Sequence, residues 1–428
     1  GATRIRKALS VERAPPIGAV IELGVLPRRV EFSSDPSSPE LQFEAMWALT
    51  NVASGTTEDT AAVVAANAVP VMVSMLSAGV TDVVEQAVWA LGNISGDSTP
   101  FRDLVLEAGA LHGLCLLVTP GQKLSLTRNL TWTISNFCRG RPRPALERVS
   151  PALPSLSLLL HSEDEEVLTH ACWAVSYISD GDNTDIRAVV DSGVVGRLVA
   201  LLTHMSLRVR KSALRAVGNI MTGDDVLTQV ALDCGSLPAL RALWELSQDA
   251  MHLKKDICWS ISNITAGTRA QIQMVMDAGM LEIMVGAAAT EQHTVRSEAL
   301  WAISNALSGG SSEQIAALAQ LGCARVLVDA VGGDDARCRA CGISGLEGLL
   351  KAGNAQLETL GENTYATEIR SLEGVAWLDA LEDAAEDAAR DKVEFIRKCM
   401  LVDVRGRRRP AGDFWRKHVR HRDQKPRG

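Results

Sequence analysis

The sequence predicts an all-α protein whose helical repeats stack into a right-handed superhelical solenoid. Apolar residues make up 46% of the 428 residues and aromatic residues only 4%, so Leu, Val, Ile and Ala must form the core. That composition suits packed helices better than twisted strands. A Trp-centred segment recurs about every 42 residues, and a second segment with helical spacing of apolar residues recurs between its copies.

The period is defined by one register position in each Trp-centred segment. A Gly follows this position after seven to nine residues, and we predict that it ends the helix in a left-handed conformation. The register residues are Trp47, Trp89, Trp132, Trp173, Arg215, Trp259, Trp301 and Ser344, and the glycines are Gly55, Gly96, Gly140, Gly181, Gly223, Gly267, Gly309 and Gly353.

The second recurrent segment has copies such as LVLEAGALHGLCLLV and AVVDSGVVGRLVALL. It predicts a short helix, a break at Gly and an amphipathic helix. Together with the Trp-centred helix this makes three helices in about 42 residues, which is an armadillo-type repeat. One such unit cannot bury its apolar faces alone, so neighbouring units must stack.

Three segments are predicted along the chain. Residues 1–353 form the repeat array, residues 354–401 a capping unit with an acidic helix at 373–387, and residues 402–428 a basic, disordered tail. Because RKALSVERAPPIGAV resembles the third helix of a repeat followed by a turn, we expect Gly1 to lie inside a repeat of a longer natural protein.

Net charge, cysteine content and hydropathy argue against several classes of function. The net charge of −8 divides into +7 on residues 402–428, which hold 10 Lys and Arg and 3 Asp, and −15 on the rest, so a cationic partner is favoured over nucleic acid. No apolar run approaches about 18 residues and no signal peptide is present, so we expect neither a membrane protein nor a secreted one. The nine cysteines show no disulfide framework and indicate buried thiols in a reduced compartment.

Trp and Asn recur four residues apart, a spacing that places both on one helix face. The Asn amide can bond both the N–H and the C=O of an extended peptide, and a Lys or Arg stem between Trp planes gains a cation–π energy of roughly 0.5 to 2 kcal/mol. Because five buried amides would need five partners, and five exposed Trp would waste apolar area, we predict a peptide-binding groove on the concave side. The pairs, called the Trp–Asn row below, are Trp47–Asn51, Trp89–Asn93, Trp132–Asn136, Trp259–Asn263 and Trp301–Asn305.

Segments such as ALGNISGDS, TISNFCRGRPRP and ALRAVGNIMTGDD closely resemble, in order and over nearly the whole chain, successive repeats of the importin-α family. The resemblance implies a nuclear import adaptor that binds Lys/Arg-rich nuclear localisation signals, links cargo to importin-β and shuttles between cytoplasm and nucleus. It implies a major site in the N-terminal repeats and a minor site in the C-terminal repeats.

In the major site, the resemblance implies that Gly55, Thr60 and Asp97 form the deepest lysine pocket. They would offer a carbonyl, a hydroxyl and a carboxylate to an ammonium group, which has three donors. Gln86, one turn before Trp89, corresponds to a further contact. The implied site residues are Trp47, Asn51, Gly55, Thr60, Gln86, Trp89, Asn93, Asp97, Trp132, Asn136, Trp173 and Tyr177.

The implied minor site has Glu298 one turn before Trp301 as its carboxylate, and its residues are Arg215, Asn219, Thr222, Asp225, Trp259, Asn263, Glu298, Trp301 and Asn305. Between the sites, Tyr177 replaces Asn and Arg215 replaces Trp, which would suit the acidic linker of a bipartite signal. Ser344 and Gly348 replace the last pair, so we expect the minor site to lack its outer wall.

The resemblance also implies partners. The family's importin-β-binding segment precedes the first repeat, and this chain begins after it, so we expect it to bind cargo without self-competition and not to dock on importin-β by itself. The acidic helix at 373–387 corresponds to the segment engaged by the export receptor, and nuclear pore proteins are further partners. We hypothesise that RGRRRP at 405–410 competes weakly for the groove.

Other motifs are assigned to structure. CRAC at 338–341 lacks a second ligand pair and predicts helix packing, and SDGDN at 179–183 lacks the remaining ligands of a calcium loop. Without a phosphate loop, a GxSxG elbow or HExxH, we predict no enzyme, metal or cofactor. The alternative function is an armadillo scaffold of the adhesion or signalling type, which would need Lys and Arg on the concave face.

Overall fold

The computed structural model describes residues 2–11, 13–355, 357, 361–372 and 389–401. All regular elements in these ranges are helices, and none is a strand, which confirms the all-α prediction. The acidic helix predicted at 373–387 and the tail at 402–428 lie outside the described residues.

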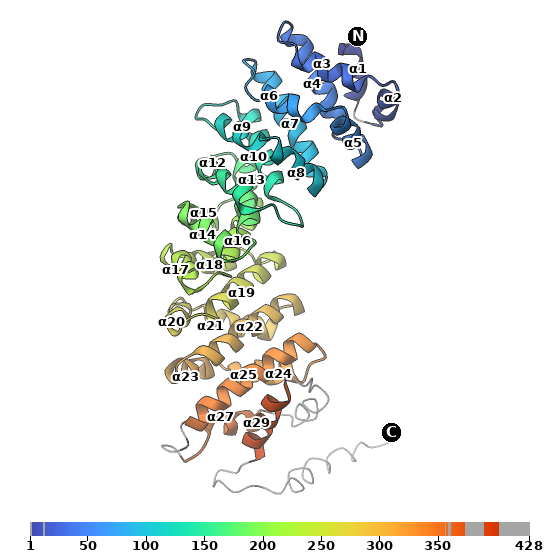
Figure 1. Ribbon diagram of the computed structural model, residues 1–428. Helices are drawn as coiled ribbons and strands as arrows, with labels where there is room; N and C mark the ends of the chain where they lie inside the picture. The colour runs from blue at the N-terminus through green and yellow to red at the C-terminus, as the bar shows by residue number, and fades with distance from the viewer. Residues whose placement is uncertain (1, 12, 356, 358–360, 373–388, 402–428) are drawn as a thin grey trace, which may run out of the picture. The chain divides into compact units, whose positions relative to one another are not determined.

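The helices recur in sets of three along the chain (Figure 1). The first helices are α2 (Ile17–Glu22), α5 (Thr57–Ala65), α8 (Thr99–Glu107), α11 (Leu146–Val149), α14 (Asn183–Asp191), α17 (Asp225–Asp233), α20 (Arg269–Asp277) and α23 (Ser312–Gln320). The second helices are α3 (Leu26–Ser34), α6 (Ala68–Met75), α9 (Ala110–Leu117), α12 (Leu153–Leu159), α15 (Val195–Leu201), α18 (Ser236–Glu245), α21 (Met280–Thr290) and α24 (Cys323–Val331), with a 3-10 turn, η1 (Ser150–Ala152), before α12. The third helices are α4 (Pro39–Val52), α7 (Thr81–Asp97), α10 (Leu124–Cys138), α13 (Glu165–Ile178), α16 (Leu207–Ile220), α19 (Met251–Thr265), α22 (His293–Gly309) and α25 (Ala336–Ala355).

Three further helices of the described ranges flank these sets. Helix α1 (Ala2–Leu9) precedes them and packs on α4, and α27 (Thr364–Ser371) and α29 (Arg390–Leu401) follow α25 and pack against it.

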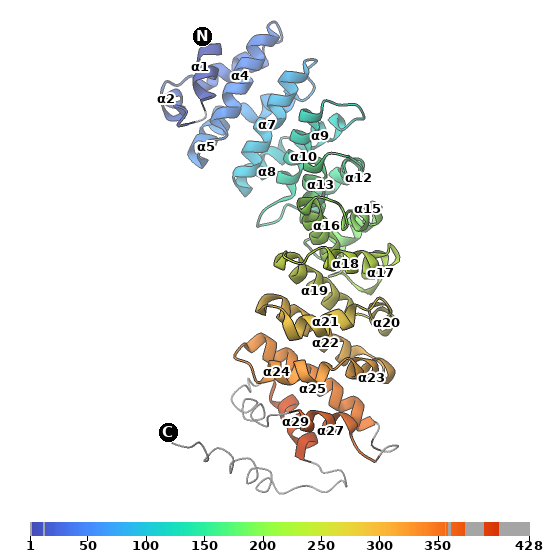
Figure 2. The same cartoon turned by 180° about the vertical axis from the view of Figure 1, so that it is seen from behind.

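The chain divides into two compact units, residues 1–235 and 236–428. In the first unit the third helices pack in the order α4, α7, α10, α13 and α16, each against its neighbours in this series, and in the second unit α22 packs between α19 and α25 (Figure 2). Consecutive third helices therefore present equivalent positions side by side within each unit.

The core of each unit consists of aliphatic side chains between these helices. In α7, for example, Val83, Ala87, Leu91 and Ile94 are fully buried at spacings of four, four and three residues. Burial of one such Val, Leu or Ile side chain contributes about 1.5 to 3 kcal/mol. The amphipathic pattern seen in the sequence is thus the pattern of burial.

The first helices begin at side-chain caps that recur with the repeat. Capping boxes start α5, α14, α20 and α23 at Thr56, Asp182, Thr268 and Ser311, and the Asp224 carboxylate accepts a bond from Leu227 N–H at the start of α17. A cap of this kind stabilises a helix by about 1 kcal/mol. These polar residues fix where each repeat begins.

The predicted role of the glycines that follow the register position is wrong except at Gly140, which has a φ of +114°. Gly96, Gly309 and Gly353 lie inside helices. Left-handed residues instead join first helices to second helices, where the turn of two or three residues requires a positive φ. They are Gly24, Asn67, Gly109, Gly193, Gly235, Gly279 and Gly322.

All nine cysteines are free, and six of them are buried. Burial raises the pKa of the Cys138 and Cys172 thiols to about 12, so both stay protonated. These two side chains act as small apolar groups in the core.

Among the described helices, none alone has the length and hydropathy needed to span a bilayer. The pairs α20 with α21 and α23 with α24 satisfy the length and composition criteria only together, and they bend by 77° and 80° between their members.

Candidate functional site

The Trp–Asn row is carried entirely by third helices. In the first unit its pairs lie on α4, α7 and α10, and in the second unit on α19 and α22. Trp89 and Trp301 are 39% and 38% exposed, which is unusual for so large an apolar side chain, and Trp47, Trp132 and Trp259 are partly exposed. Aromatic rings left open at a fixed spacing indicate a binding surface.

Two glycines of α7 make room for the next pair of the row. A Cβ on Gly92 would lie 2.3 Å from Trp132 Cζ3, and one on Gly96 would lie 2.9 Å from Asn136 Nδ2. Trp132 and Asn136 therefore lie directly on the α7 backbone. Gly96 serves helix packing and not helix termination.

Three asparagines of the row, and Asn219 at the equivalent position of α16, bond the neighbouring repeat. In these four residues Nδ2 donates to a main-chain carbonyl of the preceding third helix, 43 or 44 residues earlier. The bonds are Asn93 to Thr50 at 3.1 Å, Asn136 to Gly92 at 3.1 Å, Asn219 to Ser176 at 2.8 Å and Asn305 to Ser262 at 2.9 Å.

These bonds correct one premise of the sequence argument, because the amides do have structural partners. One N–H of each amide is used between repeats, while Oδ1 and the second N–H make no bond in the described part of the chain. Asn136 is only 4% exposed, whereas Asn93 and Asn305 are half-buried. Asn93 and Asn305 are thus better placed for a ligand than Asn136.

The first position of the row already holds a cation from the chain itself. The Arg6 guanidinium of α1 lies 4.4 Å from the Trp47 ring centroid and donates to both carboxylate oxygens of Glu44, at 2.9 and 3.1 Å. Ser10 Oγ accepts a 3.1 Å bond from Asn51 Nδ2. The sequence analysis did not identify Arg6 and Ser10, although these residues are also four positions apart. The sequence alone does not show which helix they contact.

Asp97 is the last residue of α7, and its carboxylate is only half satisfied. Oδ1 accepts a 3.1 Å bond from Thr57 Oγ1, while Oδ2 is buried and has no hydrogen-bond partner among the described residues. Burial and the negative end of the helix dipole both disfavour an unpaired carboxylate at this place. A cation at Oδ2 would remove both penalties.

The other two residues implied for the lysine pocket adjoin Asp97 through α5. Thr60 is fully buried and donates to the Ala53 carbonyl at 3.3 Å, while Gly55 is exposed in the turn between α4 and α5. The bond from Thr57 to Asp97 joins this turn to α7. The sequence argument did not single out Thr57, which orients the carboxylate.

Gln86 and Glu298 occupy equivalent places one turn before Trp89 and Trp301. Both are buried, and Gln86 Oε1 has no partner in the described ranges. In each unit an acceptor therefore lies one turn before the Trp that is most exposed among the described residues.

The residues that interrupt the row also lie on third helices. Trp173 and Tyr177 of α13 stack with their ring centroids 5.8 Å apart. Arg215 is partly exposed on α16, and Thr222 donates to the Asn219 carbonyl at 2.7 Å. Arg215, Asn219, Thr222 and the exposed Asp225 belong to the first unit, whereas Trp259, Asn263, Glu298, Trp301 and Asn305 belong to the second.

The last register position is covered by a lysine of the chain. Lys392 of α29 donates to Ser344 Oγ at 2.9 Å and lies 3.5 Å from the Glu347 carboxylate. A Cβ on Gly348 would lie 2.7 Å from the Leu307 carbonyl oxygen, so a larger residue is excluded there. Polar groups of α25 and α29 thus replace the missing Trp and Asn.

Comparison with known proteins gives consistent results. Residues 56–96, 148–180 and 182–222 match the armadillo/beta-catenin-like repeat family. Importin subunit alpha-1b of Oryza sativa subsp. japonica is 46% identical over 96% of this chain and 77% of that protein, and importin subunit alpha-4 of Arabidopsis thaliana is 50% identical over 89% and 71%. A crystal structure of an engineered protein superposes with a TM-score of 0.82 at 27% identity, covering 93% of this chain and 94% of that one. The predicted armadillo-repeat fold is confirmed.

Proposed function

The chain belongs to the importin-α family of nuclear import adaptors, and we propose that it binds Lys/Arg-rich nuclear localisation signals along its Trp–Asn row. The observation that carries this proposal is the buried, unpartnered Oδ2 of Asp97 at the C-terminal end of α7. An ammonium group there forms a charge-assisted hydrogen bond that no neutral peptide group can match. The site therefore selects lysine.

In the proposed major site, the other residues contact different parts of the peptide. The exposed ring of Trp89 stacks on the aliphatic stem of a basic side chain, and the Oδ1 of Asn93 accepts a bond from the peptide backbone. Thr60 and Gly55 supply further oxygens to the ammonium group. Arg6 on Trp47 has the geometry that we propose for a ligand side chain on the other rings.

We propose a second, minor site on α22, where Trp301 is exposed and the Glu298 carboxylate is buried one turn away. Asn305 bonds the Ser262 carbonyl with one N–H, and its Oδ1 serves the ligand. Asn263, whose Nδ2 is buried without a partner, belongs to the same site. The proposed site ends at α22, because Lys392 covers the next register position, Ser344.

Membership of the family places the protein in nucleocytoplasmic transport, with cargo and importin-β as partners in general. On the resemblance alone we propose the export receptor and nuclear pore proteins as further partners, shuttling between cytoplasm and nucleus, and the absence of catalytic activity. Nothing among the described residues favours an adhesion or signalling scaffold, which would need basic residues where Gln86, Asp97 and Glu298 lie.

Calorimetric titration with a PKKKRKV peptide tests the proposal. We expect Asp97→Asn to weaken binding about tenfold or more, because the ammonium group loses its charged partner. Asp191→Asn is the matched control, since Asp191 is also the last residue of a helix, α14, but lies outside the row. Equal affinity of parent and Asp97→Asn would contradict the lysine pocket.

A further inference from the structure

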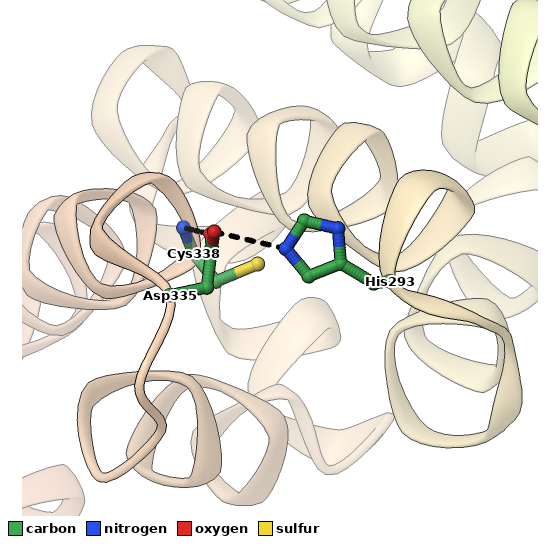
Figure 3. A group of neighbouring side chains, drawn as sticks. All are labelled: His293, Asp335 and Cys338. Carbon is green, nitrogen blue, oxygen red and sulfur yellow. Dashed lines mark hydrogen bonds and ion pairs between the residues drawn. The ribbon is translucent and has the colours of Figure 1, made fainter.

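His293, Asp335 and Cys338 bring one nitrogen, one oxygen and one sulfur donor together, away from the Trp–Asn row. Their ligand atoms all lie within 4.8 Å of one another (Figure 3). His293 is the first residue of α22, Asp335 directly precedes α25, and Cys338 lies in the first turn of α25. Two adjacent repeats of the second unit therefore supply the three side chains.

Hydrogen bonds fix the orientation of the carboxylate. Asp335 Oδ1 accepts a 2.7 Å bond from the Cys338 N–H, and Oδ2 lies 2.9 Å from His293 Nε2. The bond to the main chain leaves Oδ2 directed toward the imidazole and holds it there. In metal sites, hydrogen bonds from neighbouring groups orient the coordinating carboxylates in the same way.

The thiol is placed for coordination and not only for packing. Cys338 is 5% exposed, yet its Sγ faces the polar side chains of His293 and Asp335. Burial and the neighbouring Asp335 carboxylate raise the pKa of this thiol to about 11, so a bound metal ion has to displace its proton.

The three groups border a cavity of about 320 Å³ that Glu291, Asp329 and Asp334 also line. These carboxylates make the lining of the cavity mainly negative. Arg296 also lines the cavity and is cationic. The cavity provides the route by which an ion reaches the three donors, and space for a water as a fourth ligand.

We propose that His293, Asp335 and Cys338 bind one Zn²⁺ ion at the N-terminal ends of α22 and α25. Zinc accepts imidazole, carboxylate and thiolate together, whereas calcium and magnesium prefer oxygen ligands. Bonds of about 2.0 to 2.3 Å place tetrahedral donors roughly 3.3 to 3.8 Å apart. The side chain of His293 is 61% exposed and is free to close the remaining distance.

Binding exchanges protons for metal without any redox change. The Cys338 S–H bond breaks, an S–Zn bond forms, and the proton passes to solvent. His293 Nε2, whose N–H faces Asp335 Oδ2 in the structure, loses that proton to solvent and binds the ion through the freed lone pair, while Nδ1 carries the remaining ring proton. Asp335 Oδ2 exchanges its bond to His293 for a bond to the metal. The ion then joins α22, which carries Trp301 and Asn305, to α25.

The proposal departs from the prediction that the chain holds no metal. That prediction examined CRAC for a second pair of ligands nearby in sequence, whereas His293 lies 45 residues before Cys338. Cys341, the other cysteine of the motif, is buried and is not part of the cluster.

The full chain, freed of metal with a chelator, is titrated with Zn²⁺ in competition with a chromophoric indicator, and native mass spectrometry counts the bound ions. We expect one ion per chain with a dissociation constant in the micromolar range or below, and a Co²⁺ complex with a thiolate charge-transfer band. His293→Ala and Cys338→Ser should each weaken zinc binding about tenfold or more.

Cys341→Ser is the matched control for the buried thiol, and His418→Ala with His421→Ala is the control for the histidines near the C-terminus; both should bind zinc as the parent does. Because His293 is exposed, His293→Ala tests the site even if Cys338→Ser fails to fold. Absence of stoichiometric zinc, zinc affinity unchanged by His293→Ala, or a Co²⁺ complex without the thiolate band would overturn the proposal. Peptide binding at Asp97 is unaffected by any of these outcomes.

Discussion

At the scale of single residues, Asn93 bonds a neighbouring repeat, and we propose that it also bonds the ligand. One N–H of its amide donates to the Thr50 carbonyl of the preceding repeat, while its Oδ1 and second N–H make no bond among the described residues. In this proposal the side chain that holds two repeats together also binds the peptide backbone. The spacing of the row is set by the bonds that hold the repeats together.

Trp89 is the residue whose removal should separate binding from folding. Trp89→Ala removes the stacking surface for a basic side chain, and because the residue is only 39% exposed it also removes packing against the helix. We expect peptide affinity to fall by about 1 to 3 kcal/mol in calorimetry while circular dichroism shows that the chain stays folded.

The control for this change is Trp244→Ala. Trp244 lies on α18, outside the row, and holds Lys254 Nζ 5.1 Å from its ring centroid. Its loss should leave peptide affinity as it is. If both Trp variants lose affinity equally, the effect is one of stability and not of stacking.

Sequence reasoning identified Trp89 and Asn93 because their repetition is visible along the chain, and it identified Asp97 only through the resemblance to the importin-α family. It did not reach Thr57, Arg6 or Ser10, whose partners lie 40, 41 and 41 residues away on other helices. It also treated the Asn amides as lacking structural partners, since a main-chain acceptor 43 residues away leaves no mark on the sequence. Whether these residues bind peptide stays a prediction.

At the scale of helices, glycine marks close contact more often than helix termination. Gly92 lies in the middle of α7, where only the absence of a Cβ lets Trp132 reach the helix backbone. The left-handed glycines recur at the turn between first and second helices. The prediction identified the period and the Gly break between the first and second helices, but it expected the left-handed conformation at the glycines after the third helix, because most repeats contain glycines at both places.

Gly92→Ala should therefore destabilise the first unit. The added Cβ would lie 2.3 Å from Trp132 Cζ3 and 2.5 Å from Thr133 Oγ1, so both side chains must shift, and we expect a loss of about 1 to 3 kcal/mol in the free energy of unfolding by urea. Gly286→Ala in α21 is the matched control, since nothing lies within 4 Å of its Cβ and the helix gains propensity. A Gly92→Ala protein as stable as the control would show that Trp132 is not packed on α7.

Asp164 should make the stability of α13 depend on pH. Its bond to Arg128, at 2.6 Å, and its cap of the Val167 N–H lower the pKa of its carboxyl from the ordinary 3.8. A lowered pKa stabilises the fold above the ordinary value, and this contribution is lost as pH falls through the lowered value.

We therefore expect Asp164→Ala to cost about 1 kcal/mol of unfolding free energy at neutral pH, chiefly through the lost cap, and the difference from the parent to vanish in acid. The neighbouring exposed Glu163→Ala should cost little at either pH. A difference that persists unchanged below the ordinary pKa would mean that the carboxylate charge plays no part.

At the scale of the whole chain, the repeat period was the most informative signal. A step of 41 to 44 residues between register positions predicts three helices per repeat, and the helices of both units follow it from α2 to α25. The final repeat was harder to predict, because Ser344 and Gly348 break the pattern and Ser344 bonds Lys392 of α29, 48 positions away. The boundaries drawn at 353 and 401 stay predictions.

The acidic balance of the chain leads to a further expectation about salt. Attraction between a net charge of −8 and a basic peptide is screened as ionic strength rises, but stacking on Trp and bonds to Asn are not. Calorimetry from about 0.1 to 1 M salt should show affinity falling and then levelling off. A continued steep fall would indicate a contact that is electrostatic throughout.

The central claim is that Asp97 selects a lysine, and a double-mutant cycle tests it most directly. Calorimetry measures the affinity of the parent chain and of Asp97→Asn for PKKKRKV and for the same peptide with its first core lysine replaced by alanine. If the two groups contact each other, the lysine change weakens binding to the parent about tenfold or more but binding to Asp97→Asn hardly at all. If the lysine change has the same effect on both chains, Asp97 does not bind that lysine and the assignment is wrong.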